Sequence, residues 1–254
     1  MMAIIELTEI TKSYGTFDAL QGVNLSVSAG SVVCVLGDNG AGKSTLIKVL
    51  AGLHKPTSGE IFIDGESVSF SSPRDALAQG IATVYQDLAV VSDMSVWRNF
   101  FLGQELSTRF GALRSKEMKK ITSEQLKNMG VDIPDVETPI SSLSGGQRQV
   151  VAIARAIYFG ARVIVLDEPT AALGVKQSGM VLKFIAAARD RGIGVVLITH
   201  NPHHAYLVGD QFTILNLGRQ ILDKPKQEIT LAELTQMMAG GQELEMLSHE
   251  LARS

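Results

Sequence analysis

A glycine-rich loop between an apolar strand and a helix most constrains the fold of this chain. The loop matches the pattern G-x-x-x-x-G-K-[ST], follows the apolar run Ser31–Leu36 and leads into the periodic segment Lys43–Leu53. That order of strand, loop and helix lets backbone N–H groups and a helix N-terminus converge on phosphate oxygens. The loop comprises Gly37, Asp38, Asn39, Gly40, Ala41, Gly42, Lys43, Ser44 and Thr45. We expect Lys43 to contact the β- and γ-phosphates of a nucleotide and the Ser44 hydroxyl to ligate Mg²⁺.

A second apolar strand ends in two adjacent carboxylates. The run Val163-Ile164-Val165-Leu166 is followed by Asp167 and Glu168. Buried parallel strands carry such continuous apolar runs, and α/β folds bind ligands at the carboxyl ends of their strands. Neighbouring side chains on a strand alternate in direction, so the two carboxylates serve different roles. We expect Asp167 to hold the Mg²⁺ shell and Glu168 to act as general base toward the attacking water.

The pentapeptide Leu143-Ser144-Gly145-Gly146-Gln147 lies between these two motifs. Ser144 is placed to cap a helix that starts at Gly145 and continues with an apolar face. A helix N-terminus with exposed glycine backbone is a second potential anion site. The predicted contributors are Ser144, Gly145, Gly146 and Gln147.

With these three motifs in this order, the chain resembles the ATP-binding-cassette (ABC) ATPases, from about Leu7 to Gly218. The resemblance implies an α/β phosphate-loop NTPase core with a mixed sheet, an antiparallel β layer near the N-terminus and an inserted helical subdomain. In that family the signature loop of one subunit covers the γ-phosphate bound by the phosphate loop of another. We therefore expect a symmetric homodimer with two composite ATP sites.

The resemblance assigns three further residues. Tyr14 matches the aromatic residue that stacks on adenine, although a tyrosine that only packs at a turn is the alternative. Gln86 matches the glutamine that touches Mg²⁺ and the attacking water and moves with the membrane partner. His200 matches the histidine that contacts the γ-phosphate. The implied catalytic set is Glu168, His200, Gln86 and Lys43, and the implied metal ligands are Ser44, Gln86 and Asp167.

One segment departs from the usual family pattern. Ala171-Ala172-Leu173-Gly174 occupies the place of serine-alanine-leucine-aspartate, so the polar contacts that the aspartate makes across the dimer are not carried over. This variant, together with Phe70–Ala76 and Gly80–Gln86, resembles the monosaccharide-import ATPases of the ribose and fructose type, above all the single-cassette fructose-type members. The sequence thus predicts the ATPase subunit of a sugar importer, with membrane permease subunits and, indirectly, a solute-binding protein as partners.

Other classes fit less well. An exporter usually fuses its cassette to membrane helices, and the longest apolar stretches, such as Val32–Leu36, are far shorter than the ~20 residues a bilayer span needs. A soluble ABC ATPase that is regulatory or acts on ribosomes or DNA remains the alternative. The net charge of −3, from 23 basic and 26 acidic side chains, offers no basic surface for nucleic acid. A pure binding module conflicts with the intact Glu168 and His200.

The predicted location is the cytoplasmic face of the cell membrane, reached through the permease. The N-terminus has neither the basic nor the apolar region of a secretory signal, and the single cysteine, Cys34, fits a reducing compartment and a buried packing role. His203 and His204 lack the cysteines or carboxylates that would complete a metal site. Trp97, Phe100 and Phe101 form an aromatic cluster that either packs in the core or lines the groove that receives the permease.

The chain of 254 residues is expected to form one ABC ATPase domain, with an α/β core over residues 1–86 and 160–254 and a helical subdomain over roughly 87–159. Antiparallel strands are predicted within Ile4–Gly30 and around the Asp64-Gly65 turn. The expected core strands are Ile81–Tyr85, Arg162–Asp167, Gly194–Thr199 and a hairpin flanking Asn216–Arg219. The expected helices begin near Ser72, Ser95, Ser115, Ser144, Val175, Asn201, Leu231 and Glu243.

Overall fold

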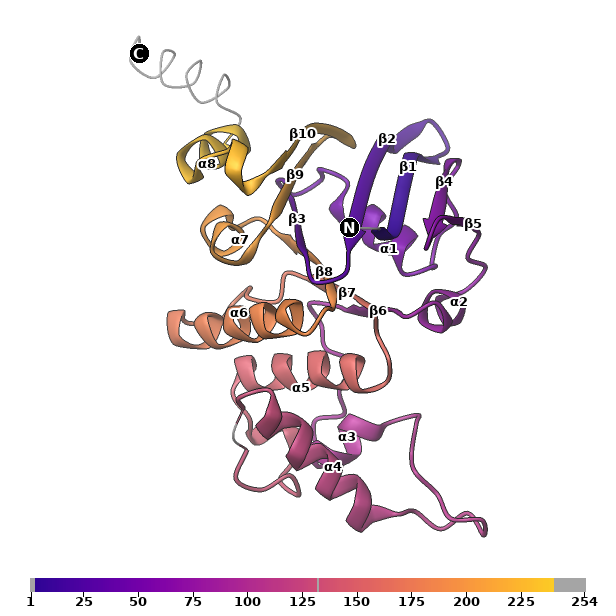
Figure 1. Cartoon of the computed structure of the whole chain (residues 1–254), viewed down its shortest axis with the longest axis vertical. Helices are drawn as coiled ribbons and strands as arrows, with labels where there is room; N and C mark the ends of the chain where they lie inside the picture. The colour runs from indigo at the N-terminus through magenta and orange to yellow at the C-terminus, as the bar shows by residue number, and fades with distance from the viewer. Residues whose placement is uncertain (1–2, 132, 240–254) are drawn as a thin grey trace.

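The computed structural model describes residues 3–131 and 133–239. The helix predicted over Glu243–Leu251 lies outside these residues. Two sheets and eight α-helices are found within the described part (Figure 1).

The first sheet is antiparallel and confirms the predicted N-terminal β layer. Its strands are β1 (Ala3–Tyr14), β2 (Phe17–Ser28), β4 (Ser58–Ile63) and β5 (Glu66–Val68), in the order β2-β1-β4-β5. The turn at Gly15 joins β1 to β2, where Tyr14 pairs with Phe17. The turn at Asp64-Gly65 joins β4 to β5, as predicted, and both residues have positive φ.

The second sheet carries the nucleotide motifs and is mixed. Its strands are β3 (Val32–Leu36), β6 (Ile81–Val84), β7 (Val163–Asp167), β8 (Gly194–Thr199), β9 (Gln211–Asn216) and β10 (Arg219–Pro225), in the order β10-β9-β3-β8-β7-β6. All neighbours pair in parallel except β9 and β10, which form the predicted hairpin. The carboxyl ends of five adjacent strands therefore lie along one edge.

The helices begin within one or two residues of their predicted starts. They are α1 (Lys43–Leu50), α2 (Pro73–Ala78), α3 (Val96–Phe101), α4 (Ser115–Asn128), α5 (Gly145–Tyr158), α6 (Val175–Asp190), α7 (Pro202–Val208) and α8 (Leu231–Met238), with short 3-10 turns at Ile140–Ser142 and Lys226–Glu228. The Asp75 carboxylate accepts a hydrogen bond from the backbone N–H of Ser72, which closes the start of α2 ahead of Pro73. Figure 1 shows α5 and α6 side by side, with α3 and α4 beyond α5.

Both faces of the second sheet are buried, as its continuous apolar strands predict. Along β3, Val33 and Val35 join a cluster with α1 and the antiparallel sheet. Cys34 and Leu36 face the opposite cluster, which contains residues of α3 to α8. This second cluster runs without interruption from the second sheet into α3 and α4. The sheet and these two helices therefore share one apolar core.

The aromatic side chains of α3 belong to that core. Trp97 is 5% exposed, and Phe100 and Phe101 are fully buried. Both phenylalanine rings lie within 6.2 Å of the rings of Tyr158 and Phe159 at the end of α5. The cluster is therefore packing, and the alternative reading, in which these rings line a permease groove, is wrong because they have almost no accessible surface.

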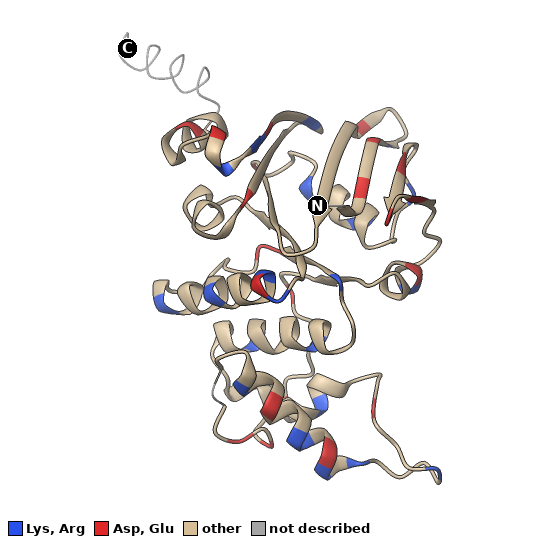
Figure 2. Ribbon diagram, viewed as in Figure 1, with Lys and Arg blue, Asp and Glu red and all other residues tan. Residues whose placement is uncertain are grey.

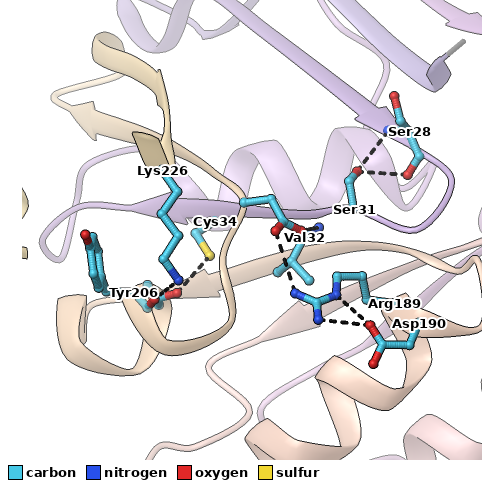
Figure 3. A network of polar contacts seen from close by, with 10 residues as sticks. Ser28, Ser31, Val32, Cys34, Arg189, Asp190, Tyr206 and Lys226 are labelled. Carbon is cyan, nitrogen blue, oxygen red and sulfur yellow. Dashed lines mark hydrogen bonds and ion pairs between the residues drawn. The ribbon is translucent and has the colours of Figure 1, made fainter. Parts of the chain in front are cut away.

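A polar network fixes the amino edge of the second sheet, opposite the nucleotide motifs (Figure 3). Asp210 accepts a hydrogen bond from the N–H of Val32 at 2.9 Å and lies 3.6 Å from the guanidinium of Arg189. Lys226 donates to the carbonyl oxygen of Tyr206 at 2.6 Å. Cys34 is buried beneath these contacts, and burial raises the pKa of its thiol, so it packs as a small apolar residue, as predicted.

Charges of both signs are interspersed over the ribbon (Figure 2). Along α4, for example, Lys120 pairs with Glu124 one turn later at 3.8 Å. None of the helices in the described part has the length and apolar character that crossing a bilayer requires.

Candidate functional site

Four neighbouring parallel strands deliver the predicted catalytic residues to one edge of the second sheet. The phosphate loop follows β3, and His200 follows β8. Asp167 ends β7 and Glu168 follows it, while Gln86 lies just beyond β6. The register pairs Leu36 with Thr199 and Asp167 with Ile198, so these strands end level with one another. The fold thus brings four of the sequence motifs together.

The phosphate loop requires glycine at both of its ends. Gly37 has φ 146°, and a Cβ there would meet the carbonyl oxygen of Leu215. Gly42 has φ 106°, and a Cβ there would lie 2.7 Å from the carbonyl oxygen of Ala19. The N–H of Gly218 donates to the carbonyl oxygen of Ala41 at 2.9 Å, so the β9–β10 turn braces the loop from outside.

Lys43 is held inside the loop by its own backbone. Its Nζ donates to the carbonyl oxygens of Gly37 at 2.6 Å and Asp38 at 2.9 Å, and the residue is 8% exposed. Burial lowers the pKa of Lys43, and the charge of Glu168 is the largest of the effects that oppose this. The ammonium group therefore lies among carbonyls and carboxylates in position for an anionic ligand.

The two carboxylates on β7 have different surroundings. Burial and the neighbouring charge of Glu168 raise the pKa of Asp167, while the charge of Lys43 opposes the rise. Glu168 leaves the strand with φ 46°, a conformation that few non-glycine residues adopt. Its N–H still donates to the carbonyl oxygen of Ile198 at 2.9 Å, so the turn is tied to β8.

Both carboxylate oxygens of Glu168 are engaged by β8 and the residue after it. Oε1 lies 2.8 Å from Nδ1 of His200, and Oε2 accepts from the hydroxyl of Thr199 at 3.1 Å. The Glu168 side chain is 12% exposed and that of His200 is 61% exposed. Sequence reasoning missed Thr199, whose only signal was its position at the strand end next to His200.

The neighbouring histidine has a structural contact. His204 Nδ1 lies 2.9 Å from the hydroxyl of Thr170, and burial lowers the pKa of this imidazole, with smaller effects from His203 and His200. Thr170 is itself 7% exposed. The contact ties the start of α7 to the segment that follows Glu168.

The signature pentapeptide starts α5 as predicted. The hydroxyl of Ser144 accepts from the N–H of Gln147 at 3.3 Å, and the Gln147 side chain accepts from the N–H of Ser144 at 2.9 Å. These reciprocal bonds form a capping box. A Cβ on Gly145 would lie 2.7 Å from Leu173, and one on Gly146 would lie 3.2 Å from Gln177.

The signature pentapeptide and the phosphate loop are not neighbours within the described chain. The side-chain contacts of Ser144 and Gln147 are local. The two glycines face Leu173, which precedes α6, and Gln177 in the first turn of α6. The phosphate loop contacts the β9–β10 turn and Ala19 of β2 instead. The phosphate loop and the signature pentapeptide therefore have separate sets of contacts within one chain.

The remaining predicted residues are accessible. Tyr14 is 42% exposed at the end of β1, where its ring meets the edge of His54 at a centroid distance of 5.7 Å. Lys12 Nζ lies 5.3 Å from the Tyr14 ring centroid. Gln86 is exposed just beyond β6, and so is Ser44 at the start of α1.

Comparison with known proteins agrees with this geometry. The family model described as "ABC transporter" matches residues 20–171. The xylose/arabinose import ATP-binding protein XylG of Sulfolobus acidocaldarius is 43% identical over 238 residues, which is 94% of each chain. The fructose import ATP-binding protein FrcA of Rhizobium meliloti is 39% identical over 94% of this chain and 95% of that protein. The ribose import ATP-binding protein RbsA of Lacticaseibacillus paracasei is 36% identical, and the match spans 47% of its length.

Solved structures share the fold. CbiO1 from Clostridium perfringens, part of the ABC transporter complex cbiONQ, has a TM-score of 0.78 at 28% identity and covers 99% of this chain and 100% of its own. A dimeric cassette, MJ0796, in a post-hydrolysis state bound to ADP and Pi, has a TM-score of 0.73 at 28% identity, with 87% and 98% coverage. The chain belongs to the ABC transporter family and is one of its ATP-binding cassettes, an ATPase. Its relatives among the curated proteins are the ATP-binding subunits of sugar importers, as the segments around Phe70–Ala76 and Ala171–Gly174 predict.

Proposed function

We propose that this chain hydrolyses ATP as a homodimer to power the uptake of a monosaccharide through a separate membrane permease. The observation that carries the proposal is the convergence of Lys43, Asp167, Glu168 and His200 at one sheet edge, while the signature pentapeptide lies apart on α5. A second copy, related by a two-fold axis, supplies the missing half of each site. The names of the XylG and FrcA relatives support a sugar as the transported solute.

The nucleotide contacts follow from the accessible groups. The phosphate loop, from Gly37 to Thr45, surrounds the phosphates with backbone N–H groups, and Lys43 exchanges its carbonyl partners for phosphate oxygens. Tyr14 offers an exposed ring to the adenine base. Ser144, Gly145, Gly146 and Gln147 of the partner copy present the N-terminus of α5 to the γ-phosphate.

The donor set fits Mg²⁺. The Ser44 hydroxyl, the Asp167 carboxylate and the Gln86 amide all offer oxygen, the ligand type that this hard cation prefers. Both Ser44 and Gln86 are exposed at the same sheet edge as Asp167. When bound, the ion neutralises charge on the β- and γ-phosphates.

Glu168 is placed to accept a proton from the attacking water. A carboxylate only accepts hydrogen bonds, so the 2.8 Å contact places a proton on Nδ1 of His200. That contact, together with the Thr199 hydroxyl, fixes the direction of the carboxylate at the end of β7. The side chain of His200 is largely exposed, and its Nε2, when it also carries a proton, can donate to an oxygen of the γ-phosphate.

The permease is proposed to dock in an apolar groove of 310 Å³ between β6, α2 and α5. It is lined by the end of β6 next to Gln86, by Leu88 and Val90, and by Val151 and Phe159 of α5. Docking there places the subunit at the cytoplasmic face of the membrane as a peripheral component. The proposal also keeps the predicted division into an α/β core, residues 1–86 and 160–254, and a helical subdomain over about 87–159.

The soluble regulatory, ribosome-associated or DNA-associated alternative is not favoured. The import proteins match over more than nine-tenths of this chain, and residues of both charges are interspersed along its ribbon (Figure 2).

Uptake of labelled xylose, arabinose, fructose and ribose in a strain that lacks the gene tests the proposal. We expect uptake of at least one sugar to be lost, restored by the intact chain and not by Glu168→Gln. Neighbouring genes are expected to encode a permease and a solute-binding protein. Normal uptake of all four sugars, beside genes for DNA repair or translation, would contradict the importer assignment.

A further inference from the structure

One buried amide side chain connects the groove to the signature pentapeptide. Asn99 of α3 is 2% exposed and lines the groove between β6 and α5. Its Oδ1 accepts from the N–H of Val91 at 2.7 Å. Its Nδ2 donates to the carbonyl oxygens of Val91 at 3.0 Å, Met94 at 3.0 Å and Ser95 at 3.1 Å. Every hydrogen bond that the structure gives this side chain goes to the irregular segment 91–95.

Segment 91–95 continues the stretch that starts at Gln86. Between β6 and α3 the backbone forms no helix or strand, so segment 91–95 depends on side chains for its shape. A buried polar group that loses its hydrogen-bond partner costs free energy. The carbonyl groups of segment 91–95 are therefore held in the positions where they meet the Asn99 amide. The amide side chain therefore sets the path of the chain from the groove to α3.

The same segment is bonded on its other side to the residues that lead into the signature. The N–H of Ile140 donates to the carbonyl oxygen of Met94 at 2.9 Å, and the N–H of Ser141 donates to that of Ser92 at 3.1 Å. Ser95 also forms an antiparallel bridge with Pro139. Leu143, the first residue of the signature, follows two residues after Ser141.

Helix α3 is independently fixed to the signature helix. The Arg155 guanidinium of α5 donates to the carbonyl oxygen of Leu102, at the end of α3, at 2.6 Å. Phe100 and Phe101 pack against Tyr158 and Phe159 of α5. Asn99 thus ties segment 91–95 to a helix that packs on α5 (Figure 1).

We propose that Asn99 is a positioning residue that couples the occupancy of the groove to the placement of the signature pentapeptide. The inference rests on the proposed function, because it takes the groove as the permease site and the signature as half of the ATP site. A displacement of segment 91–95 is passed through Met94 and Ser92 to Ile140 and Ser141, and from there to Ser144. Loss of the amide leaves the phosphate loop intact and releases the signature.

Asn99→Ala and Asn99→Asp in the purified full-length chain test this inference. The aspartate keeps the shape and the acceptor for Val91 but removes the donors to three carbonyls. We expect hydrogen exchange at the amides of Ile140 and Ser141 to accelerate by at least about tenfold, with α4 still protected. We also expect kcat for Mg²⁺-ATP hydrolysis to fall about tenfold or more, while the Kd for a fluorescent ADP analogue changes less than about twofold.

Thr122→Val is the matched control. Thr122 is fully buried in α4, and its hydroxyl donates to the carbonyl oxygen of Met118 at 2.8 Å without touching segment 91–95. We expect this variant to leave kcat and the exchange of Ile140 and Ser141 within about twofold of the starting protein.

Unchanged exchange at Ile140 and Ser141 in both Asn99 variants would overturn the inference, as would an equal loss of kcat in Thr122→Val. Absence of ATP hydrolysis by the unaltered chain would instead count against the proposed function. Because hydrogen exchange needs no catalysis, it would still decide the role of Asn99, and the two failures are distinguishable.

Discussion

Glu168 Oε1 lies 2.8 Å from Nδ1 of His200, across the boundary between β7 and the end of β8. The two residues are separated by 32 positions in the chain, and parallel pairing of β7 with β8 brings them together. The contact directs the carboxylate toward the sheet edge that carries the phosphate loop.

Glu168→Gln is expected to bind ATP and to lose hydrolysis by ~10²–10⁴-fold, because the amide keeps the shape of the side chain and cannot accept a proton. Steady-state phosphate release and equilibrium binding of a fluorescent ATP analogue measure the two effects. Glu66→Gln, an exposed position on β5, is the control and should keep its rate. Equal turnover by Glu168→Gln would remove this residue from the general-base role.

Thr199→Val is expected to lower kcat by about tenfold with little change in KM, because the loss of one hydrogen bond frees the Glu168 carboxylate to rotate. The hydroxyl also accepts from the N–H of Asn201 at 3.1 Å, so valine leaves that group unpaired as well. Thr199→Ser keeps the oxygen and should retain most of the rate. If serine and valine reduce kcat equally, packing at this buried position, and not the hydroxyl, is what matters.

The motifs were predictable because each combines a local pattern with a backbone requirement. Gly37 and Gly42 have φ values that favour glycine, and the apolar runs before Gly37 and Asp167 are buried on both faces. Ser144 caps a helix through its own neighbours. At these positions the local sequence is sufficient to predict the backbone conformation and the burial.

Other features depend on contacts between distant segments and could not be predicted. Thr199 and Asn99 gain their roles only when β8 meets Glu168 and when segment 91–95 folds back on α3. The bounds of the strands within Ile4–Gly30 could not be predicted, because the pairing of β1 with β2 has register shifts and Glu9 has φ 51°, which interrupt the alternation of buried and exposed residues. The sequence left two interpretations of Trp97, core packing or a permease groove, because the same aromatic pattern occurs in both.

Tyr14→Ala is expected to weaken ATP binding by about 5–150-fold, since stacking of a base on an aromatic ring contributes ~1–3 kcal/mol. Tyr14→Phe keeps the flat ring and should bind as well as the unaltered chain. The exposed ring makes only an edge contact with His54, so neither change should lower the melting temperature appreciably. Binding titrations and thermal unfolding of both variants provide the check. A loss of affinity in Tyr14→Phe equal to that in Tyr14→Ala would contradict stacking.

Mixing two inactive variants tests whether the signature acts on the partner's nucleotide. Lys43→Ala disables the phosphate loop. Gly145→Asp places a carboxylate where the γ-phosphate is expected, and an acidic residue in the first turn favours α5 itself. The new Cβ lies close to the end of the Leu173 side chain and in ordinary contact with the end of Gln177, so the fold should tolerate it.

In a mixed dimer, the intact phosphate loop of the Gly145→Asp copy faces the intact signature of the Lys43→Ala copy. One site of two is then complete. We expect each variant alone to have less than about a hundredth of the normal rate, since Lys43→Ala loses a charge contact to the γ-phosphate and Gly145→Asp places a like charge beside it. Half of the dimers in an equal mixture are mixed, so the mixture should recover about a quarter of the rate if the two sites work independently. Phosphate release measured over a range of mixing ratios, with Glu66→Gln replacing either variant as the control, gives the comparison. Should the mixture stay as inactive as its components, the signature and the phosphate loop of a single chain would have to form the site together.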